Sequence, residues 1–171
     1  IGSPRQEGNT QLLAEAFARG AETHHHVTTL SVRDLNVGPC TGCNACFASE
    51  GNACFQNDDM ARVYAQMAQA DMLVIASPVY FYGISAQLKA VIDRLHNPLR
   101  NTFHIKKMAL LLVGGASLPE LFDSITTQYE LALRFFNLED GGRVLVRGVR
   151  ECGDIRQTPA LEEAYTLGER Q

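Results

Sequence analysis

The sequence predicts a doubly wound α/β domain, with a five-stranded parallel sheet in the order 2-1-3-4-5 and helices on both faces. Stretches of strand character alternate with stretches of helical periodicity along the whole chain, as in folds built from β-α-β units. Residues 72–76 (MLVIA) and 107–113 (KMALLLV) are apolar runs, typical of central parallel strands that are buried on both faces. The crossovers between such strands are right-handed. We expect a single domain over residues 1–171.

The first half of the chain supplies one edge of this sheet. Residues 1–2 have the character of a strand end, and we expect most of strand one to be missing from the chain. A helix is predicted over about 10–19. Residues 27–32 (VTTLSV) alternate apolar and hydroxyl side chains, which suits an edge strand. Asp58 or Asp59 caps the next helix. The stripe of that helix assigned to the core is Met60, Val63, Tyr64 and Met67.

The second half of the chain continues the alternation. Ser85 is the predicted cap of the helix that follows the strand at 72–76. Ser117 and Glu120 have the spacing of a capping box and are expected to open a long helix. Residues 142–149 are the predicted last strand, and a final helix is expected to start at residues 158–159 (TP), because proline is favoured in the first turn.

Composition narrows the classes of function. The net charge of −4 argues against nucleic acid as the main partner. The sequence contains no apolar run long enough to span a membrane and no recognisable signal peptide. Four of the five cysteines cluster in one stretch, unlike a disulfide framework. This pattern favours a reducing compartment, with metal or redox use of the thiols, and we expect a cytoplasmic protein.

The first ten residues predict an anion site. They form a turn between a strand end and a helix, where backbone N–H groups and the helix dipole attract negative charge. Ser3, Asn9 and Thr10 can add hydrogen bonds, and Arg5 a charge-assisted one. The turn has neither the lysine motif of nucleoside triphosphate sites nor the G-x-G-x-x-G of dinucleotide sites. A single phosphate monoester fits better, although a solvated, capped turn has the same composition.

The predicted strand order brings three loops together. In a doubly wound sheet, ligands bind outside the carboxyl ends of the strands where the strand order reverses. Loops 2–10, 77–83 and 114–117 meet there. The first loop is polar, the second is aromatic, and the third is small enough for close approach of a ligand to the backbone.

Two segments, GSPRQEGNT at 2–10 and SPVYFYGISAQLKAVIDR at 77–94, resemble the NADPH-dependent FMN reductase group of the flavodoxin-like superfamily. The resemblance runs nearly end to end. It implies that FMN is bound and that NADH or NADPH is the electron donor, with no catalytic acid or base among the side chains. The residues that it places along the flavin ring are Pro78, Tyr80, Phe81, Gly114 and Gly115.

The cysteines of residues 40–54 predict a metal site. Cys40, Cys43, Cys46 and Cys54 supply four thiolates, the ligand set of a [4Fe–4S] cluster, and their spacing resembles the compact motif of the iron–sulfur flavoproteins, a branch of the same family. Four thiolates also suit structural zinc, and cluster-free relatives carry similar loops. Cys152 lies outside this spacing and is expected to be a free thiol.

Three functions compete on this evidence. The favoured one is an FMN-dependent NAD(P)H oxidoreductase that passes electrons to a quinone, a small acceptor or an electron-transfer partner. A flavodoxin-type carrier without reductase activity is the first alternative, although the mild net charge of this chain and its Arg5 argue against it. A domain whose cysteine loop only holds structural zinc is the second. For the favoured function we expect a homodimer or homotetramer, with no nucleic-acid or membrane partner.

Overall fold

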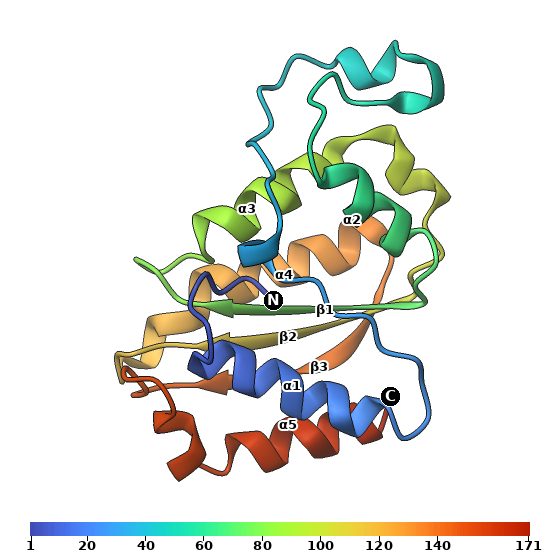
Figure 1. The fold of residues 1–171 in the computed structure, drawn as a ribbon. Coiled ribbons are helices and arrows are strands. Elements are labelled where there is room, and N and C mark those ends of the chain that lie inside the picture. Colours follow the sequence, from blue (N-terminus) through green and yellow to red (C-terminus); the bar gives the residue numbers. More distant parts are fainter.

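The computed structural model describes all 171 residues and has a parallel sheet at its centre (Figure 1). Its strands are β1 (Met72–Pro78), β2 (Lys107–Val113) and β3 (Glu139–Val146), in the order β1-β2-β3. The two apolar runs are therefore neighbouring strands, paired from Met72–Lys107 to Pro78–Val113. The prediction of a parallel α/β sheet is confirmed. The structure contains three strands, and the five-strand order stays a prediction.

The expected edge strand at 27–32 is not a regular strand, and the reason is its partner. Val32 N–H donates to Ile1 O (2.9 Å), and Gly2 N–H donates to Ala76 O (2.7 Å). Ile1 and Gly2 thus lie between the 30–32 segment and β1. Their hydrogen bonds on this side reach only residues 30 and 32, so residues 27–29 have no paired backbone beside them in the structure.

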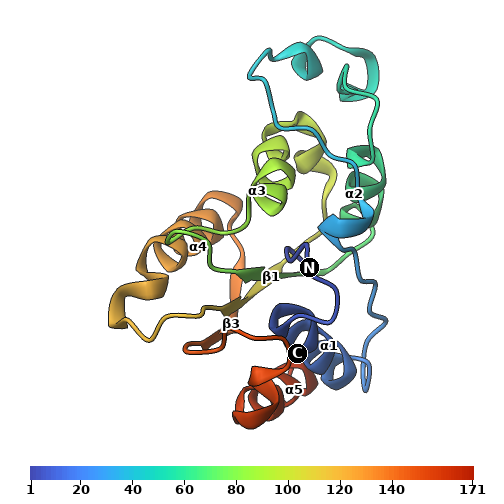
Figure 2. The same cartoon turned by 60° about the vertical axis from the view of Figure 1, so that its left-hand side comes forward.

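The helices form two layers, one on each face of the sheet (Figures 1 and 2). Helices α1 (Asn9–Ala21) and α5 (Ala160–Glu169) cover one face. The other face carries α2 (Met60–Met67), α3 (Ala86–Asp93) and α4 (Asp123–Phe136). The stripe of α2 that was assigned to the core is buried, as predicted. None of the helices is both long and apolar enough to cross a membrane.

Two glycines allow α1 and α5 to pack at very short distance. A Cβ atom on Gly20 would lie 2.0 Å from Tyr165 O, and a Cβ atom on Gly168 would lie 2.1 Å from Phe17 O. Both distances are far inside van der Waals contact, so each helix accepts the other only because these positions have no side chain. The contact fixes α1, whose N-terminus carries the predicted anion site.

The predicted cap at Ser85 is confirmed, since Ser85 Oγ accepts a hydrogen bond from Leu88 N–H (3.2 Å). At α2 the N-cap residue is Asp59, whose side chain does not cap the helix, and the preceding Asp58 accepts from Met60 N–H through Oδ1 (3.1 Å). The capping box at Ser117 is wrong. Residues 119–122 form a 3₁₀ turn before α4 begins at Asp123, because Pro119 keeps Leu118 extended (φ −64°, ψ 135°) and a helix cannot start before it.

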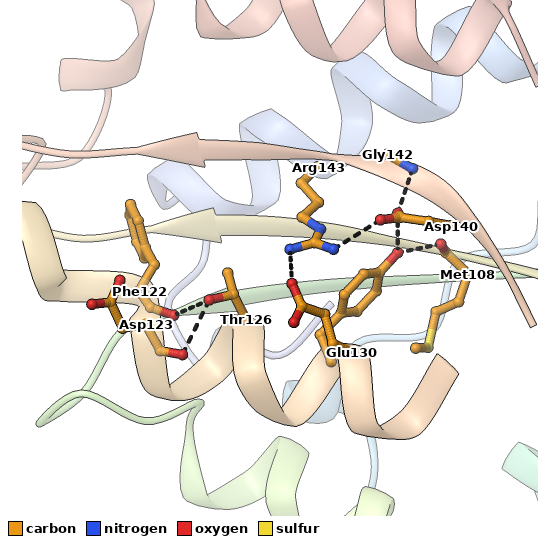
Figure 3. A network of polar contacts seen from close by, with 9 residues as sticks. Met108, Phe122, Asp123, Thr126, Glu130, Asp140, Gly142 and Arg143 are labelled. Atoms are coloured by element: carbon orange, nitrogen blue, oxygen red, sulfur yellow. Dashed lines mark hydrogen bonds and ion pairs between the residues drawn. The ribbon is translucent and has the colours of Figure 1, made fainter. Parts of the chain in front are cut away.

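Strand β3 begins at Glu139, three residues before the predicted start, and a polar network explains this (Figure 3). The buried Tyr129 hydroxyl lies between two acceptors, Met108 O and Asp140 Oδ1 (2.7 Å). Asp140 also accepts from Gly142 N–H (2.9 Å) and from Arg143 (2.9 Å). Burial raises the pKa of Asp140, but these donors outweigh it and hold the pKa below its usual value. The network ties α4 to the first residues of β3.

Candidate functional site

A cleft of about 230 Å³ opens at the carboxyl ends of the strands. Four loops line it: those at residues 2–10, 78–80 and 113–115, as predicted, and a fourth at 149–152 that the sequence analysis did not include. The lining residues are Ser3, Arg5, Gly8, Asn9, Thr10, Pro78, Val79, Tyr80, Val113, Gly115, Val149, Arg150 and Cys152. Seven of the nine residues predicted to bind the cofactor are among them, and Phe81 and Gly114 are not.

The N-terminus of α1 forms the polar end of the cleft. Its N-cap is Gly8, and no side chain caps the helix. The first hydrogen bond of α1 runs from Leu12 N–H to Gly8 O (3.1 Å), so the N–H groups of residues 9–11 precede the helical ladder. Ser3 and Thr10 are buried beside them. Free backbone donors at a helix N-terminus are suited to a phosphate group.

Asn9 was predicted to contribute its side chain to the anion site, but the structure gives that side chain another role. Its Nδ2 donates to Glu151 O (2.8 Å), and its Oδ1 accepts from Gly153 N–H (3.0 Å) and Ile155 N–H (3.3 Å). The Asn9 side chain therefore holds the fourth loop in place at the rim of the cleft. Only its backbone N–H remains for a ligand.

Two arginines and no carboxylate line the cleft, which gives its polar end a positive charge. Arg5 Nη1 donates to Arg150 O (3.5 Å), and Arg150 Nε donates to Gly115 O (2.9 Å). A Cβ atom on Gly115 would lie 2.9 Å from Arg150 Cγ, so the arginine stem lies across this glycine. Sequence reasoning missed Arg150, although it follows β3 and the rule for carboxyl ends of strands applies to that loop as well.

The aromatic segment Tyr80–Gly83 forms a tight hairpin turn beside the cleft. Tyr80 N–H donates to Gly83 O (2.9 Å), and Gly83 N–H donates to Tyr80 O (3.0 Å). The two central residues, Phe81 and Tyr82, both have positive φ values (49° and 62°). Such turns normally contain Asn or Gly, and aromatic residues in this conformation are strained. Phe81 is 99% exposed, so the strained turn holds an apolar ring in solvent next to the cleft.

Gly114 was predicted to contact the flavin, but it is not among the residues that line the cleft. A Cβ atom here would lie 2.4 Å from Leu121 Cδ2, so the glycine allows the loop to pack against the start of the 3₁₀ turn before α4. Its N–H donates to Val146 O (2.8 Å). Gly114 therefore supports Gly115, which is the residue that lines the cleft.

The predicted metal ligands lie together on one loop that projects beyond α2 and α3 (Figures 1 and 2). Cys40, Cys43, Cys46 and Cys54 are all free thiols, as is Cys152. Hydrogen bonds, led by that from Ala45 N–H, lower the pKa of the Cys43 thiol. Burial raises the pKa of the Cys46 thiol, and the charges of the other three thiols of the loop raise it further. The four thiols share one region, but no three of them converge as metal ligands do.

The donor set still fits an iron–sulfur cluster or zinc in number and chemistry. Four positions of the loop have positive φ values, which let a short chain curve around a centre. These positions are Gly42, Asn44, Gly51 and Asn52.

Proteins similar in sequence to this chain are named as FMN-dependent enzymes or flavoproteins. The family model described as NADPH-dependent FMN reductase matches residues 1–132. The chain is 43% identical over 116 residues to the iron–sulfur flavoprotein MJ1083 of Methanocaldococcus jannaschii, a match that covers 67% of this chain and 56% of that protein. It is 26% identical over 174 residues to YwqN of Bacillus subtilis, named as an NAD(P)H-dependent FMN-containing oxidoreductase, with 97% and 92% of the two chains covered.

The fold has close neighbours among solved structures. NAD(P)H:quinone oxidoreductase from Methanothermobacter marburgensis superposes with a TM-score of 0.73 at 15% identity, over 99% of this chain and 92% of that one. The chain spans about half the length of the iron–sulfur flavoproteins that it matches. Since the family model covers more than three quarters of the residues, the chain belongs to the NADPH-dependent FMN reductase family.

Proposed function

We propose that the cleft binds FMN, with the phosphate at the Ser3–Thr10 turn, and that the protein is an NAD(P)H oxidoreductase. The observation that carries this proposal is the uncapped N-terminus of α1 beside Arg5 and Arg150, a combination that selects a compact anion. The cleft contains no lysine for a nucleotide β- or γ-phosphate. Membership of the FMN reductase family supports the same ligand.

The rest of the cleft suits the flavin ring. Pro78 and Tyr80 offer flat apolar walls, and Gly115 allows the ring edge to approach the backbone. Phe81, held in solvent by the strained turn, offers an apolar surface beside the cleft, against which a nicotinamide would stack. When bound, FMN supplies the redox chemistry by accepting hydride from the nicotinamide. The side chains of this chain bind and orient, and we assign none of them as a proton donor or acceptor.

We propose a quinone, another small acceptor or an electron-transfer partner as the oxidant. A structural neighbour is named as a quinone oxidoreductase, which favours the first class. Exposed Leu131 and Phe135 on α4 favour a homodimer or homotetramer, because large apolar side chains in one patch are commonly covered by a second copy. The free thiols suit a cytoplasmic location. The bonds of Ile1 and Gly2 to their neighbours are consistent with the five-strand order 2-1-3-4-5.

We further propose that Cys40, Cys43, Cys46 and Cys54 hold a [4Fe–4S] cluster. All four are free, they share one loop, and relatives of Methanocaldococcus jannaschii and Methanosarcina thermophila that align with this chain are named iron–sulfur flavoproteins. In this proposal the loop closes around the cluster only when the cluster is inserted, and the four thiols therefore do not converge in the protein without a cluster. Structural zinc is the alternative.

The FMN site is tested by removing its charged and hydroxyl donors. Arg5→Ala with Thr10→Ala removes one charge-assisted and one neutral hydrogen bond, about 1–3 kcal/mol in all, and the Kd for FMN should rise about 5- to 160-fold. Quenching of flavin fluorescence measures the affinity. Arg62→Ala, which removes an exposed arginine on α2 far from the cleft, is the matched control and should leave the Kd unchanged. Unchanged affinity in the double variant would show that the phosphate lies elsewhere.

The cluster is tested by anaerobic reconstitution, with analysis of iron, sulfide and zinc and paramagnetic resonance of the reduced protein. We expect four irons and four sulfides, about one cluster per chain. Cys43→Ala should abolish loading, whereas Cys152→Ala should retain it, because Cys152 lies in the cleft and not on the loop. A reconstituted protein that holds zinc and no acid-labile sulfide would establish the alternative.

A further inference from the structure

A buried ion pair closes the neck of the cysteine loop. Arg94, which directly follows α3, is 3% exposed, and its Nη1 pairs with Asp58 Oδ2, whose side chain is 10% exposed. The same two groups hold Gly38: Asp58 Oδ2 accepts from Gly38 N–H (3.0 Å), and Arg94 Nη1 donates to Gly38 O (3.4 Å). Gly38 lies two residues before Cys40, and Asp58 lies four residues after Cys54. The pair therefore joins both ends of the loop.

The residues after Arg94 hold the body of the loop. Asn97 is buried, and its Nδ2 donates to Asn52 O (2.8 Å), two residues before Cys54. The ring of His96 lies 5.2 Å from that of Phe47, next to Cys46. The short segment 94–97 that follows α3 thus contacts the cysteine loop at Gly38, Phe47 and Asn52, and this segment lies under the loop in Figure 1.

Arg94 has one donor that the protein does not use. Its Nε atom is buried and has no hydrogen-bond partner, and it is the only side-chain nitrogen or oxygen in the structure with this property. An unpaired buried donor of a charged group is costly, and native proteins keep few of them. Burial lowers the pKa of Arg94, but Asp58 and, more weakly, a Cys54 thiolate outweigh it and raise the pKa above its ordinary value. Of the four thiols of the loop, Cys54 is the one whose charge acts on the guanidinium.

We infer that Arg94 is a positioning residue for the thiolate-bound centre of the cysteine loop, an inference that rests on the cluster proposed above. The Nη1 atom joins the loop ends, and the free Nε–H is a donor for the anionic sulfurs once the loop closes. Hydrogen bonds to the sulfurs and the local charge set the reduction potential of iron–sulfur clusters. Arg94 stabilises the more negative, reduced cluster and so raises this potential.

Two substitutions give shifts of opposite sign. Arg94→Lys keeps the positive charge beside Asp58 but removes the Nε donor, and it should lower the midpoint potential of the cluster. Asp58→Asn removes the negative partner while keeping a side-chain acceptor for Gly38 N–H, and it should raise the potential. We expect each variant to change the equilibrium constant for cluster reduction by about tenfold, which is 59 mV for a one-electron couple.

The experiment is a redox titration of the reconstituted protein, followed by paramagnetic resonance, with the flavin potential measured in the same samples. Lys89→Gln removes an exposed cation from the preceding helix α3 and should leave the cluster potential at the wild-type value. If Arg94→Lys does not fold, Asp58→Asn alone carries the test. Wild-type potentials in the variants that load a cluster would overturn the role of Arg94 and leave the cluster itself intact. A wild-type protein without iron and sulfide would instead overturn the proposed cluster, and the inference with it.

Discussion

Replacing Asn9 should weaken both the fold and FMN binding, because this side chain joins α1 to the loop that carries Arg150. Asn9 is 8% exposed and makes three hydrogen bonds, to Glu151 O, Gly153 N–H and Ile155 N–H. Asn9→Ala would leave one carbonyl and two N–H groups of the loop without these partners. Arg150 and Cys152, which line the cleft, lie in the same loop.

The magnitude follows from the geometry of the three bonds. Two of them are short, at 2.8 and 3.0 Å, and the third is 3.3 Å. A net loss of about 0.5–1.5 kcal/mol per bond, increased for donors left buried, gives about 2–4 kcal/mol of unfolding free energy. The loosened loop must be ordered again when FMN binds, so the Kd should rise at least about tenfold, equivalent to 1.4 kcal/mol.

Asn9→Asp separates the two effects. A carboxylate still accepts from Gly153 and Ile155 N–H, and a negative charge near a helix N-terminus is favourable by about 0.3–1 kcal/mol, so stability should fall less than in Asn9→Ala. The same charge repels the FMN phosphate, so affinity should fall more.

Urea unfolding of the protein without FMN and flavin fluorescence titration measure the two quantities. Asn101→Ala, an exposed asparagine whose side chain makes no hydrogen bond, is the control and should match the wild type in both. Asn9→Ala with wild-type unfolding and wild-type FMN affinity would refute the role of this side chain.

Three further variants test other parts of the account. Gly168→Ala adds a Cβ atom 2.1 Å from a backbone carbonyl of α1 and should lower the free energy of urea unfolding by about 1–3 kcal/mol. Gly83→Ala is the control and should lower it much less, because the atom nearest to its new Cβ lies at 3.6 Å. Equal losses would contradict the contact between α1 and α5. Burial raises the pKa of Asp58, but the hydrogen bonds that it accepts outweigh burial and lower the pKa below its ordinary value. The ionised carboxylate therefore stabilises the fold above the unfolded pKa of about 3.9, and this stabilisation is lost as the pH falls through the lower folded pKa. Between about pH 5 and 3, the unfolding free energy of Asp58→Asn should therefore fall less than that of the wild type. Parallel falls in the two proteins would contradict a lowered pKa of Asp58. Phe81→Ala should leave the urea midpoint unchanged but weaken FMN or nicotinamide binding several-fold, since the ring is 99% exposed beside the cleft. Wild-type binding of both ligands by this variant would remove Phe81 from the site.

The sequence predicted the parts of the fold that depend on local pattern. Residues 107–113 form β2 with the predicted bounds, because an apolar run of that length has few alternatives to a buried strand. The cap at Ser85 was also local and is confirmed. The capping box at Ser117 failed because a neighbouring proline prevents the helix start. The predicted start of β3 was wrong because it depends on a side-chain hydrogen bond from Tyr129 on the preceding helix, which the strand pattern does not reveal.

The candidate site was predicted where a general rule applied and missed where contacts between distant residues decide. The rule that ligands bind at the carboxyl ends of strands brought together the loops that contain Ser3, Pro78 and Gly115. Arg150 was missed although the same rule covers the loop after β3, and the contact that places its side chain in the cleft, with the carbonyl of Gly115, joins residues far apart in the sequence. The unpaired Nε of Arg94 is visible only when the whole environment of the side chain is known.

Transfer of hydride from a nicotinamide to FMN bound in this cleft is the central claim. The direct measurement is anaerobic mixing of the FMN-loaded protein with about one equivalent of NADH or NADPH per flavin, while the absorbance of the oxidised flavin is recorded over time. We predict that at least one of the two nucleotides bleaches the bound flavin within seconds. Flavin that stays oxidised with both nucleotides would contradict the reductase and leave a flavodoxin-type electron carrier.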